Sequence, residues 1–135
     1  MKKFLVAFFL LFTFLMLSKA VYSQKLVFCE GVDSKGKPQS PSSTFSIPKG
    51  GGYFYFLVNL NGYELGCTYV NYDIYEVNSD NTETYSTTIN QDEMQTSWTW
   101  FWKKVTFYTA GDYRVYVYDC NGSILTSAYL TITYK

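Results

Sequence analysis

Three tryptophans stand at alternate positions in the segment TSWTWFWKKVTFY, residues 96–108. Trp98, Trp100 and Trp102 would share one face of an extended chain, because successive side chains of a strand point to opposite sides. Exposed aromatic faces can stack on ligands, including sugar rings, whose C–H groups are weakly apolar. The same side chains are also large enough to fill a core. The segment therefore leaves two alternatives, a ligand-binding row or a plug of the hydrophobic interior.

Acid–base and metal chemistry have little support in the sequence. The chain contains no histidine, which removes histidine bases, histidine metal ligands and Ser-His-Asp or Cys-His nucleophiles. Paired carboxylates can hydrolyse glycosides, but no acidic residue stands in a recognisable catalytic motif or in calcium-loop spacing. We therefore expect no enzyme activity, no cofactor and no metal site. The carboxylates available are Asp73, Glu76, Asp92, Glu93, Asp112 and Asp119.

The first 23 residues have the organisation of a signal peptide. Lys2 and Lys3 precede an apolar run over residues 4–17, which is shorter than the roughly 20 residues needed to span a bilayer. Small residues then offer a cut after Ala20 or after Ser23, and we expect the second. The alternative is an uncleaved N-terminal anchor. The sequence thus predicts an exported protein, periplasmic, cell-surface or secreted, with no transmembrane segment in its mature part.

The mature chain, residues 24–135, is long enough for one domain with its own core. Eight basic and eleven acidic residues give it a net charge of −3, and no basic patch is present, so nucleic acid is not an expected partner. Thirteen Tyr, six Phe and three Trp are an unusual aromatic load. Because each buried tyrosine hydroxyl needs a hydrogen-bond partner, some tyrosines should lie on a surface, where they can form a recognition face.

Apolar side chains repeat with a period of two almost throughout this part, and no stretch has helical periodicity. Asn61-Gly62 and Asn121-Gly122 are strong signals for tight turns. The pattern predicts an all-β sandwich or barrel of seven or eight short strands. The expected strands cover 25–30, 44–48, 53–60, 67–78, 84–90, 104–108 (or 98–108), 112–120 and 123–135, with 31–43 as a turn-rich connection.

The segment KVTFYTAGDYRVYVYDCNGSIL resembles the last strands of bacterial immunoglobulin-like and PKD-like β-sandwiches. In those families a strand ends in a short Gly turn, followed by Tyr-x-Val-x-Val and a polar Asn-Gly hairpin. The resemblance is strongest over residues 104–132 and implies a single immunoglobulin-like antiparallel β-sandwich over residues 24–135. It also implies that Tyr113 is a tyrosine corner, with its hydroxyl bonded to backbone upstream. The core residues that it implies are Val105, Phe107, Val115 and Val117.

The three cysteines are compatible with one disulfide in an exported protein. In the sandwich that the resemblance implies, Cys67 begins the third strand and Cys120 ends the sixth. Those strands are neighbours, and these two ends lie at the same pole. The resemblance therefore implies a Cys67–Cys120 disulfide. Cys29 would be either a buried small hydrophobe or a link to another chain.

The orientation of the tryptophans depends on the register of their strand. If one strand runs straight over 98–108, the three tryptophans and Tyr108 face outward, beside Tyr116 and Tyr118 if the neighbouring strand packs similarly. If a bulge at Lys103-Lys104 shifts the register by one residue, the tryptophans point inward instead. An outward row would be a large exposed apolar patch, which usually marks an interaction site.

Three functions follow from these alternatives. The sequence favours an exported, non-catalytic binding or adhesion module that holds a protein or glycan with an aromatic-rich sheet face. The alternative is a structural or accessory subunit of a cell-surface assembly, in contact through an aromatic face or an edge strand, including self-association. A small secreted hydrolase with paired carboxylates is the least favoured. The expected contact residues are Trp98, Trp100, Trp102, Tyr108, Tyr116 and Tyr118.

Overall fold

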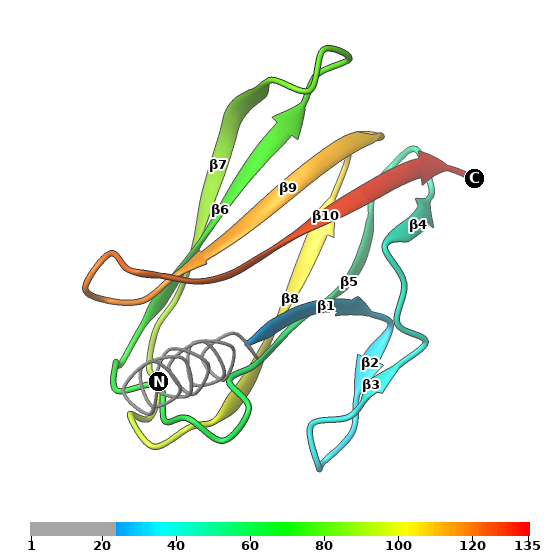
Figure 1. Ribbon diagram of the computed structural model, residues 1–135. Coiled ribbons are helices and arrows are strands. Elements are labelled where there is room, and N and C mark those ends of the chain that lie inside the picture. The colour runs from blue at the N-terminus through cyan, green and yellow to red at the C-terminus, as the bar shows by residue number, and fades with distance from the viewer. Residues whose placement is uncertain (1–23) are drawn as a thin grey trace, which may run out of the picture.

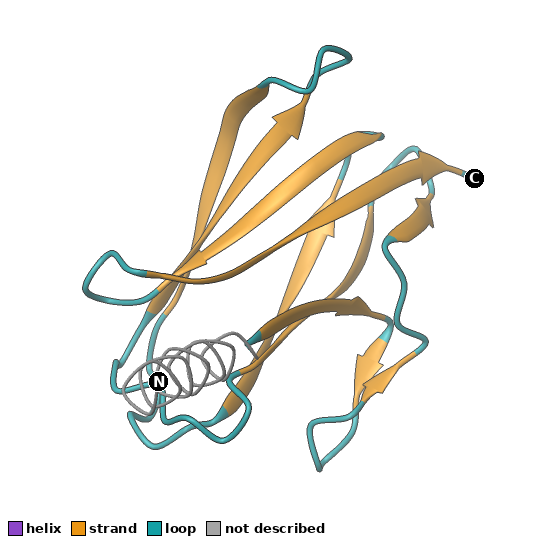
Figure 2. Ribbon diagram, in the orientation of Figure 1, coloured by secondary structure: helices purple, strands orange, loops and turns teal. Residues whose placement is uncertain are grey.

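The computed structural model describes residues 24–135, and the signal peptide expected over residues 1–23 lies outside the described part. The described chain forms strands and no helix, so it has no helix that could cross a membrane. The strands build two packed layers (Figure 1; Figure 2). They are β1 (Lys25–Cys29), β2 (Gly31–Val32), β3 (Pro38–Gln39), β4 (Thr44–Ile47), β5 (Gly52–Asn59), β6 (Val70–Val77), β7 (Glu83–Gln91), β8 (Trp100–Phe107), β9 (Gly111–Tyr118) and β10 (Ile124–Tyr134).

The two layers are of unequal size. The smaller sheet has the strand order β1-β5-β8, and the larger sheet has the order β4-β10-β9-β6-β7. A separate short hairpin consists of β2 and β3. The expectation of a purely antiparallel sandwich needs one correction, because β4 pairs with β10 in parallel. The chain reaches β4 by crossing over from the smaller sheet, so no hairpin imposes antiparallel pairing on these two strands.

Eight of the strands overlap the segments that sequence periodicity predicts, namely β1 and β4 to β10. In β9, for example, Tyr113, Val115 and Val117 are buried and the residues between them are more exposed. The β2–β3 hairpin falls inside the connection 31–43. Periodicity does not reveal it, because a strand of two residues has no measurable period.

An aromatic core fills the space between the layers. Phe54 stacks on Phe45 with ring centroids 4.4 Å apart and on Phe107 at 5.2 Å. Tyr72 is fully buried, and its hydroxyl donates to Gln91 Oε1 at 2.6 Å, so its one polar side-chain atom is satisfied. Burial raises the pKa of Tyr72 well above its usual value. The core also contains Val105, Phe107, Val115 and Val117.

Tyr113 links the start of β9 to the turn before it. Its hydroxyl donates to the carbonyl oxygen of Thr109 at 2.7 Å, and its ring meets Phe107 edge-on with centroids 5.1 Å apart. A buried tyrosine bonded to backbone four residues upstream has the geometry of a tyrosine corner. The bond fixes the chain where it passes from one layer to the other.

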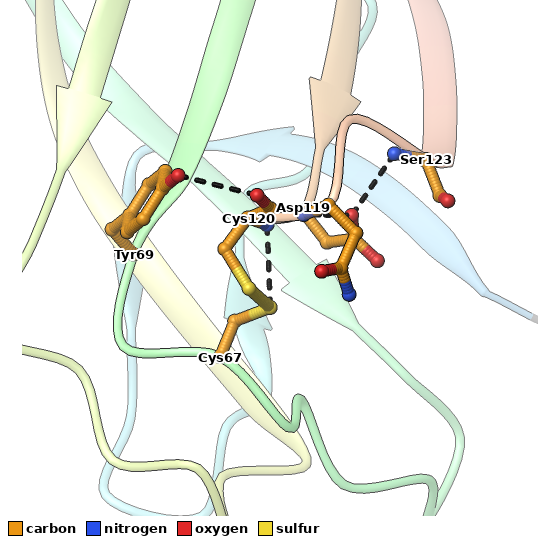
Figure 3. The surroundings of a disulfide bond; sticks show 6 residues. Cys67, Tyr69, Asp119, Cys120 and Ser123 are labelled. Atoms are coloured by element: carbon orange, nitrogen blue, oxygen red, sulfur yellow. Dashed lines mark hydrogen bonds between the residues drawn. A yellow bond between two sulfur atoms is a disulfide. The ribbon is translucent and has the colours of Figure 1, made fainter.

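Cys67 and Cys120 form the expected disulfide, with Cα atoms 5.8 Å apart (Figure 3). It joins the loop before β6 to the residues just after β9, and hydrogen bonds reinforce the same place. Cys120 N donates to Cys67 Sγ at 3.2 Å, and the Tyr69 hydroxyl donates to the Cys120 carbonyl at 3.2 Å. Asp119 Oδ1 accepts the backbone N–H of Ser123 at 2.9 Å and so shapes the adjoining turn (Figure 3). The disulfide therefore ties together two ends at one pole of the sandwich.

Candidate functional site

The tryptophan segment forms the free edge of the smaller sheet. β8 pairs with β5 in one continuous register over Trp100–Phe107, so the bulge considered at Lys103-Lys104 is absent. Phe101 and Val105 face the core, whereas Trp102 faces outward and is 46% exposed. The straight-strand alternative therefore holds for the residues of β8.

Trp98 does not continue this strand, which corrects the idea of a single row of three tryptophans. The backbone N–H of Trp98 donates to the backbone carbonyl of Gln95 at 3.1 Å. The backbone carbonyl of Trp98 accepts the backbone N–H of Leu65 at 2.8 Å. These bonds hold Trp98 in the loop that crosses from β7 to β8. Its side chain is half-buried against the core.

Trp102 takes part in an aromatic cluster on the outer face of the smaller sheet. The rings of Trp102 and Tyr55 meet edge-on with centroids 5.3 Å apart, and Tyr53 lies next to Tyr55 at 6.4 Å. Lys104 places its ammonium 3.9 Å from the centre of the Tyr53 ring, a cation–π contact. The half-buried Trp100 pairs with Asn59 at the other end of this strand pair.

The β2–β3 hairpin covers part of this outer face. A Cβ added to Gly36, in the hairpin loop, would lie 2.7 Å from the Trp100 indole, so backbone and ring are in close contact. Leu57 shares the face of Trp102, and Cys29 shares the face of Tyr55, yet Leu57 is 2% exposed and Cys29 is fully buried. Cys29 is a free thiol whose pKa is raised by burial, so the structure supports its role as a small buried hydrophobe.

A groove of about 800 Å³ follows the free edge of β8. It is lined by Gln91 and Asp92 at the end of β7 and by every residue from 97 to 104. All three tryptophans of the sequence are among these residues. The volume lies within the range of roughly 300–1,000 Å³ that small-ligand sites occupy, and its lining combines indole rings with amide, hydroxyl, carboxylate and ammonium groups.

Two features protect the edge of β8 from pairing with another strand. Gln91 Nε2 donates to the carbonyl oxygen of Trp102 at 3.0 Å, so a side chain already occupies a backbone acceptor in the middle of the edge. Lys103 stands between Phe101 and Val105, on the side of β8 that faces the core. An inward-pointing charge on an edge strand opposes edge-to-edge association.

The charged groups of the groove differ in their partners. Among residues 24–135, the Lys103 ammonium has no hydrogen bond and no ion pair, although the residue is half-buried. The neighbouring Lys104 is engaged with Tyr53. Gln91 and Lys103 were not among the contact residues expected from sequence. The signal for Lys103 was available, because it is the one charged residue at a core-facing position of the strand; Gln91 carries no local signal.

Tyr116 and Tyr118 lie elsewhere, which corrects the expectation of one aromatic face shared with the tryptophans. β8 and β9 are consecutive in the chain but belong to different sheets. Tyr116 and Tyr118 therefore lie on the outer face of the larger sheet, opposite Trp102. Tyr108, 66% exposed, follows β8 with its ring against Gly51 and is not part of the groove.

The outer face of the larger sheet has its own ordered cluster around Arg114. The guanidinium lies 4.8 Å from the centre of the Tyr116 ring and 4.7 Å from that of Tyr129, and it pairs with Glu83 at 3.5 Å. The Tyr116 hydroxyl donates to Glu83 Oε1 at 2.6 Å. Burial, and then this hydrogen bond, raise the pKa of Tyr116 to about 12. The side chains of Arg114, Glu83, Tyr116 and Tyr129 therefore hold one another in place.

The carboxylates considered for catalysis have structural roles where their contacts are defined. Asp73 accepts a hydrogen bond from Thr88, and Asp112 accepts one from Thr131. Asp119 shapes the turn after β9. Across residues 24–135, no group of three acidic, histidine or cysteine side chains is arranged to hold a metal ion.

No protein-family model and no curated protein sequence matches the chain. A crystal structure of an immunoglobulin-like protein from Pseudomonas aeruginosa is similar to it, with 13% identity and a TM-score of 0.49. The match covers 84% of this chain and 98% of that one. In this chain the N-terminal segment contributes an edge strand to each sheet, β1 to the smaller one and β4 to the larger one. The central strands of the larger sheet have the order β10-β9-β6. Together with the tyrosine corner, this arrangement makes the domain an immunoglobulin-like β-sandwich.

Proposed function

We propose that this protein is an exported, non-catalytic binding module that holds a saccharide in the groove along β8. One observation carries the proposal. All three tryptophans of the chain line a single groove of about 800 Å³, together with the exposed polar side chains of Asp92 and Ser97. Indole faces suit the C–H surfaces of sugar rings, and the polar groups suit their hydroxyls.

The state of the β8 edge favours a saccharide over an extended peptide. A peptide that added a strand to β8 would need the backbone acceptors of that edge. The Trp102 carbonyl already accepts from Gln91, and Lys103 places a charge on the core-facing side of the strand. A saccharide needs neither backbone pairing nor a flat edge, so these two features leave its binding unhindered.

Export has two independent supports. The N-terminal residues have the organisation of a signal peptide. The Cys67–Cys120 disulfide belongs to the chemistry of oxidising compartments, since cytosolic thiols are normally kept reduced. A protein with both features meets its ligand in the periplasm, at the cell surface or outside the cell.

The proposal is tested by passing the protein, exported and processed by its host, over immobilised glycans and measuring how much is retained. Wild type should be retained on at least one glycan, and Trp102→Ala should lose at least tenfold in affinity for it. Tyr108→Ala is the matched control, because this exposed aromatic residue follows the same strand but lies outside the groove. Absence of retention on every glycan, or an equal loss in both variants, would contradict the proposal.

A structural subunit that self-associates is the second candidate function. The observation in its favour is the outer face of the larger sheet, where Tyr85 and Tyr129 are both more than half exposed beside the ordered Arg114 cluster. Tyrosine and arginine are, with tryptophan, the residues enriched at the energetic centres of protein interfaces. Light-scattering mass over a concentration series tests it: a defined oligomer that Tyr129→Ser dissociates supports this role, and a monomer at every concentration excludes it.

A further inference from the structure

Lys103 is in an unusual position for a lysine. It alternates with Phe101 and Val105, which are 2% and 4% exposed, on the core-facing side of β8. It is only half-buried because β8 is the edge of its sheet, and there it lines the groove. Among residues 24–135 its ammonium has neither an ion pair nor a hydrogen bond.

An ammonium with no counterion within the fold is free to pair with an incoming opposite charge, and a hydrogen bond between two charged groups is stronger than one between neutral groups. Lys104 provides the internal comparison. It is adjacent in the same strand, but its ammonium lies over the Tyr53 ring and has a partner within the fold. Of the two lysines of the groove, Lys103 is therefore the one whose ammonium has no partner among residues 24–135.

Two further lysines lie beside the contact between the hairpin loop and Trp100. Lys35 and Lys37 flank Gly36, whose backbone touches the Trp100 indole. Four of the eight lysines and arginines of the mature chain thus lie in β8 or in the hairpin loop against it. Glu30 and Asp33 of that hairpin segment, and Asp92 and Glu93 after β7, are the acidic residues that oppose them. The groove lining itself, with Lys103, Lys104 and Asp92, is positive by one charge, although the mature chain carries a net charge of −3.

We infer that the ligand of the groove is an anionic saccharide, whose carboxylate or sulfate pairs with Lys103 while its sugar ring stacks on a tryptophan. The inference rests on the proposed function and specifies its class of ligand. The tryptophans supply a contact that any sugar ring can make. Lys103 selects for the acidic group, and Asp92 at the same groove opposes it.

The experiment measures tryptophan fluorescence while two pairs of probes are added to the processed protein. The first pair is tetragalacturonate and its methyl ester, which has the same rings and linkages without the charge. The second pair is a carrageenan tetrasaccharide and its desulfated form, which separates sulfate from carboxylate recognition. At least one acidic probe should bind ten times or more tightly than its neutral counterpart, and the difference should shrink as sodium chloride is raised.

Variants assign the effect to a residue. Lys103→Gln should reduce affinity for the acidic probe about tenfold, to the level of the neutral probe, and Lys103→Arg should restore most of it. Lys49→Gln is the matched control, because this exposed lysine lies outside the groove, and it should stay within about twofold of wild type. Asp92→Asn should bind the acidic probe more tightly. Unchanged melting temperatures would show that each of these surface variants folds.

The outcomes separate this inference from the function on which it rests. If acidic and neutral probes bind equally and depend on Trp102 but not on Lys103, the anionic class is wrong and the saccharide-binding function stands. If Lys103→Gln and Lys49→Gln lose affinity equally, the specific role of Lys103 is wrong. If none of the four probes binds and no glycan retains the protein, both the inference and the proposed function fail.

Discussion

Gln91 connects the buried Tyr72 to the backbone of Trp102. Its Oε1 accepts the Tyr72 hydroxyl at 2.6 Å, and its Nε2 donates to the Trp102 carbonyl at 3.0 Å. The first bond satisfies the polar atom of a fully buried side chain, and the second joins the end of β7 to the free edge of β8. One amide thus closes the side of the sandwich where the two sheets are not otherwise paired.

Replacing Gln91 tests this connection. Gln91→Ala leaves the Tyr72 hydroxyl buried without a partner, so we expect it to lower the free energy of unfolding by about 1–3 kcal/mol. Urea denaturation measures the change. Tyr72→Phe removes the polar atom itself, and the double variant should therefore be less destabilised than the sum of the two single variants. Strictly additive losses would show that the two side chains are not coupled.

The disulfide is expected to be a major source of stability. Cys67 and Cys120 are 53 residues apart, and closing a loop of that length in the unfolded chain corresponds to about 4 kcal/mol in the chain-entropy model. Reduction, or the Cys67→Ala/Cys120→Ala double variant, should lower the free energy of unfolding, measured by urea denaturation, by about that amount. A loss of unfolding free energy smaller than about 1 kcal/mol would mean that the disulfide does not constrain the unfolded chain.

Thiol counting checks the cysteine assignment separately. Cys29 is free and fully buried, and burial raises the pKa of its thiol. A thiol reagent should therefore react slowly with the oxidised native protein and modify one cysteine per mature chain after unfolding without reductant. Three reactive thiols in that experiment would show that no disulfide had formed. Rapid reaction in the native state would show that the hairpin does not cover Cys29.

Gly36 should be required for the contact between the hairpin and Trp100. Its φ of +81° disfavours any other residue, and an added Cβ would lie 2.7 Å from the indole. Gly62 is the matched control, because its φ is +88° but a Cβ there would meet nothing within 4 Å. We expect Gly36→Ala to destabilise the protein by about 1 kcal/mol or more beyond the loss in Gly62→Ala, and to red-shift tryptophan emission. Equal losses would mean that only backbone conformation matters at position 36.

Alkaline pH should weaken the fold through its hydrogen-bonded tyrosines. The pKa of Tyr116 is raised from 10 in the unfolded chain to about 12 in the folded protein. Between these values the folded state holds a proton that the unfolded state has lost, so stability is full below pH 10 and declines as pH rises toward 12. Denaturation at pH 9, 10 and 11 should show this decline, and Tyr116→Phe should make it shallower. The same slope in wild type and Tyr116→Phe would contradict the assignment.

The sequence predicts much of the fold because the relevant signals are local. Period-two alternation predicts eight of the strands. The resemblance around Tyr113 predicts which two cysteines form the disulfide. Sheet membership is different, because periodicity says which face of a strand is buried but not which strands pair. β8 and β9 follow one another across a short turn, yet the turn crosses between layers, and this separates Tyr116 from Trp102.

The candidate site depends on contacts between distant segments, which is why only part of it could be predicted. Trp98 leaves the strand because its carbonyl is bonded to Leu65, more than thirty positions earlier in the sequence. The covered outer face has a sequence signal in hindsight, since adjacent Leu57 and Val58 are both apolar and both buried. Gln91 has no such signal, because its role arises only when the end of β7 meets the edge of β8.

The most direct test of a saccharide site at β8 is a nuclear magnetic resonance titration of the three tryptophan indole N–H signals. All three tryptophans line the groove, and no other tryptophan exists to confuse the assignment. On addition of tetragalacturonate, the account predicts shifts of the indole signals and of the backbone amides near Lys103, with the amides of Arg114 and Tyr116 unmoved. Shifts confined to the Arg114 and Tyr116 side, with the indole signals unchanged, would contradict it.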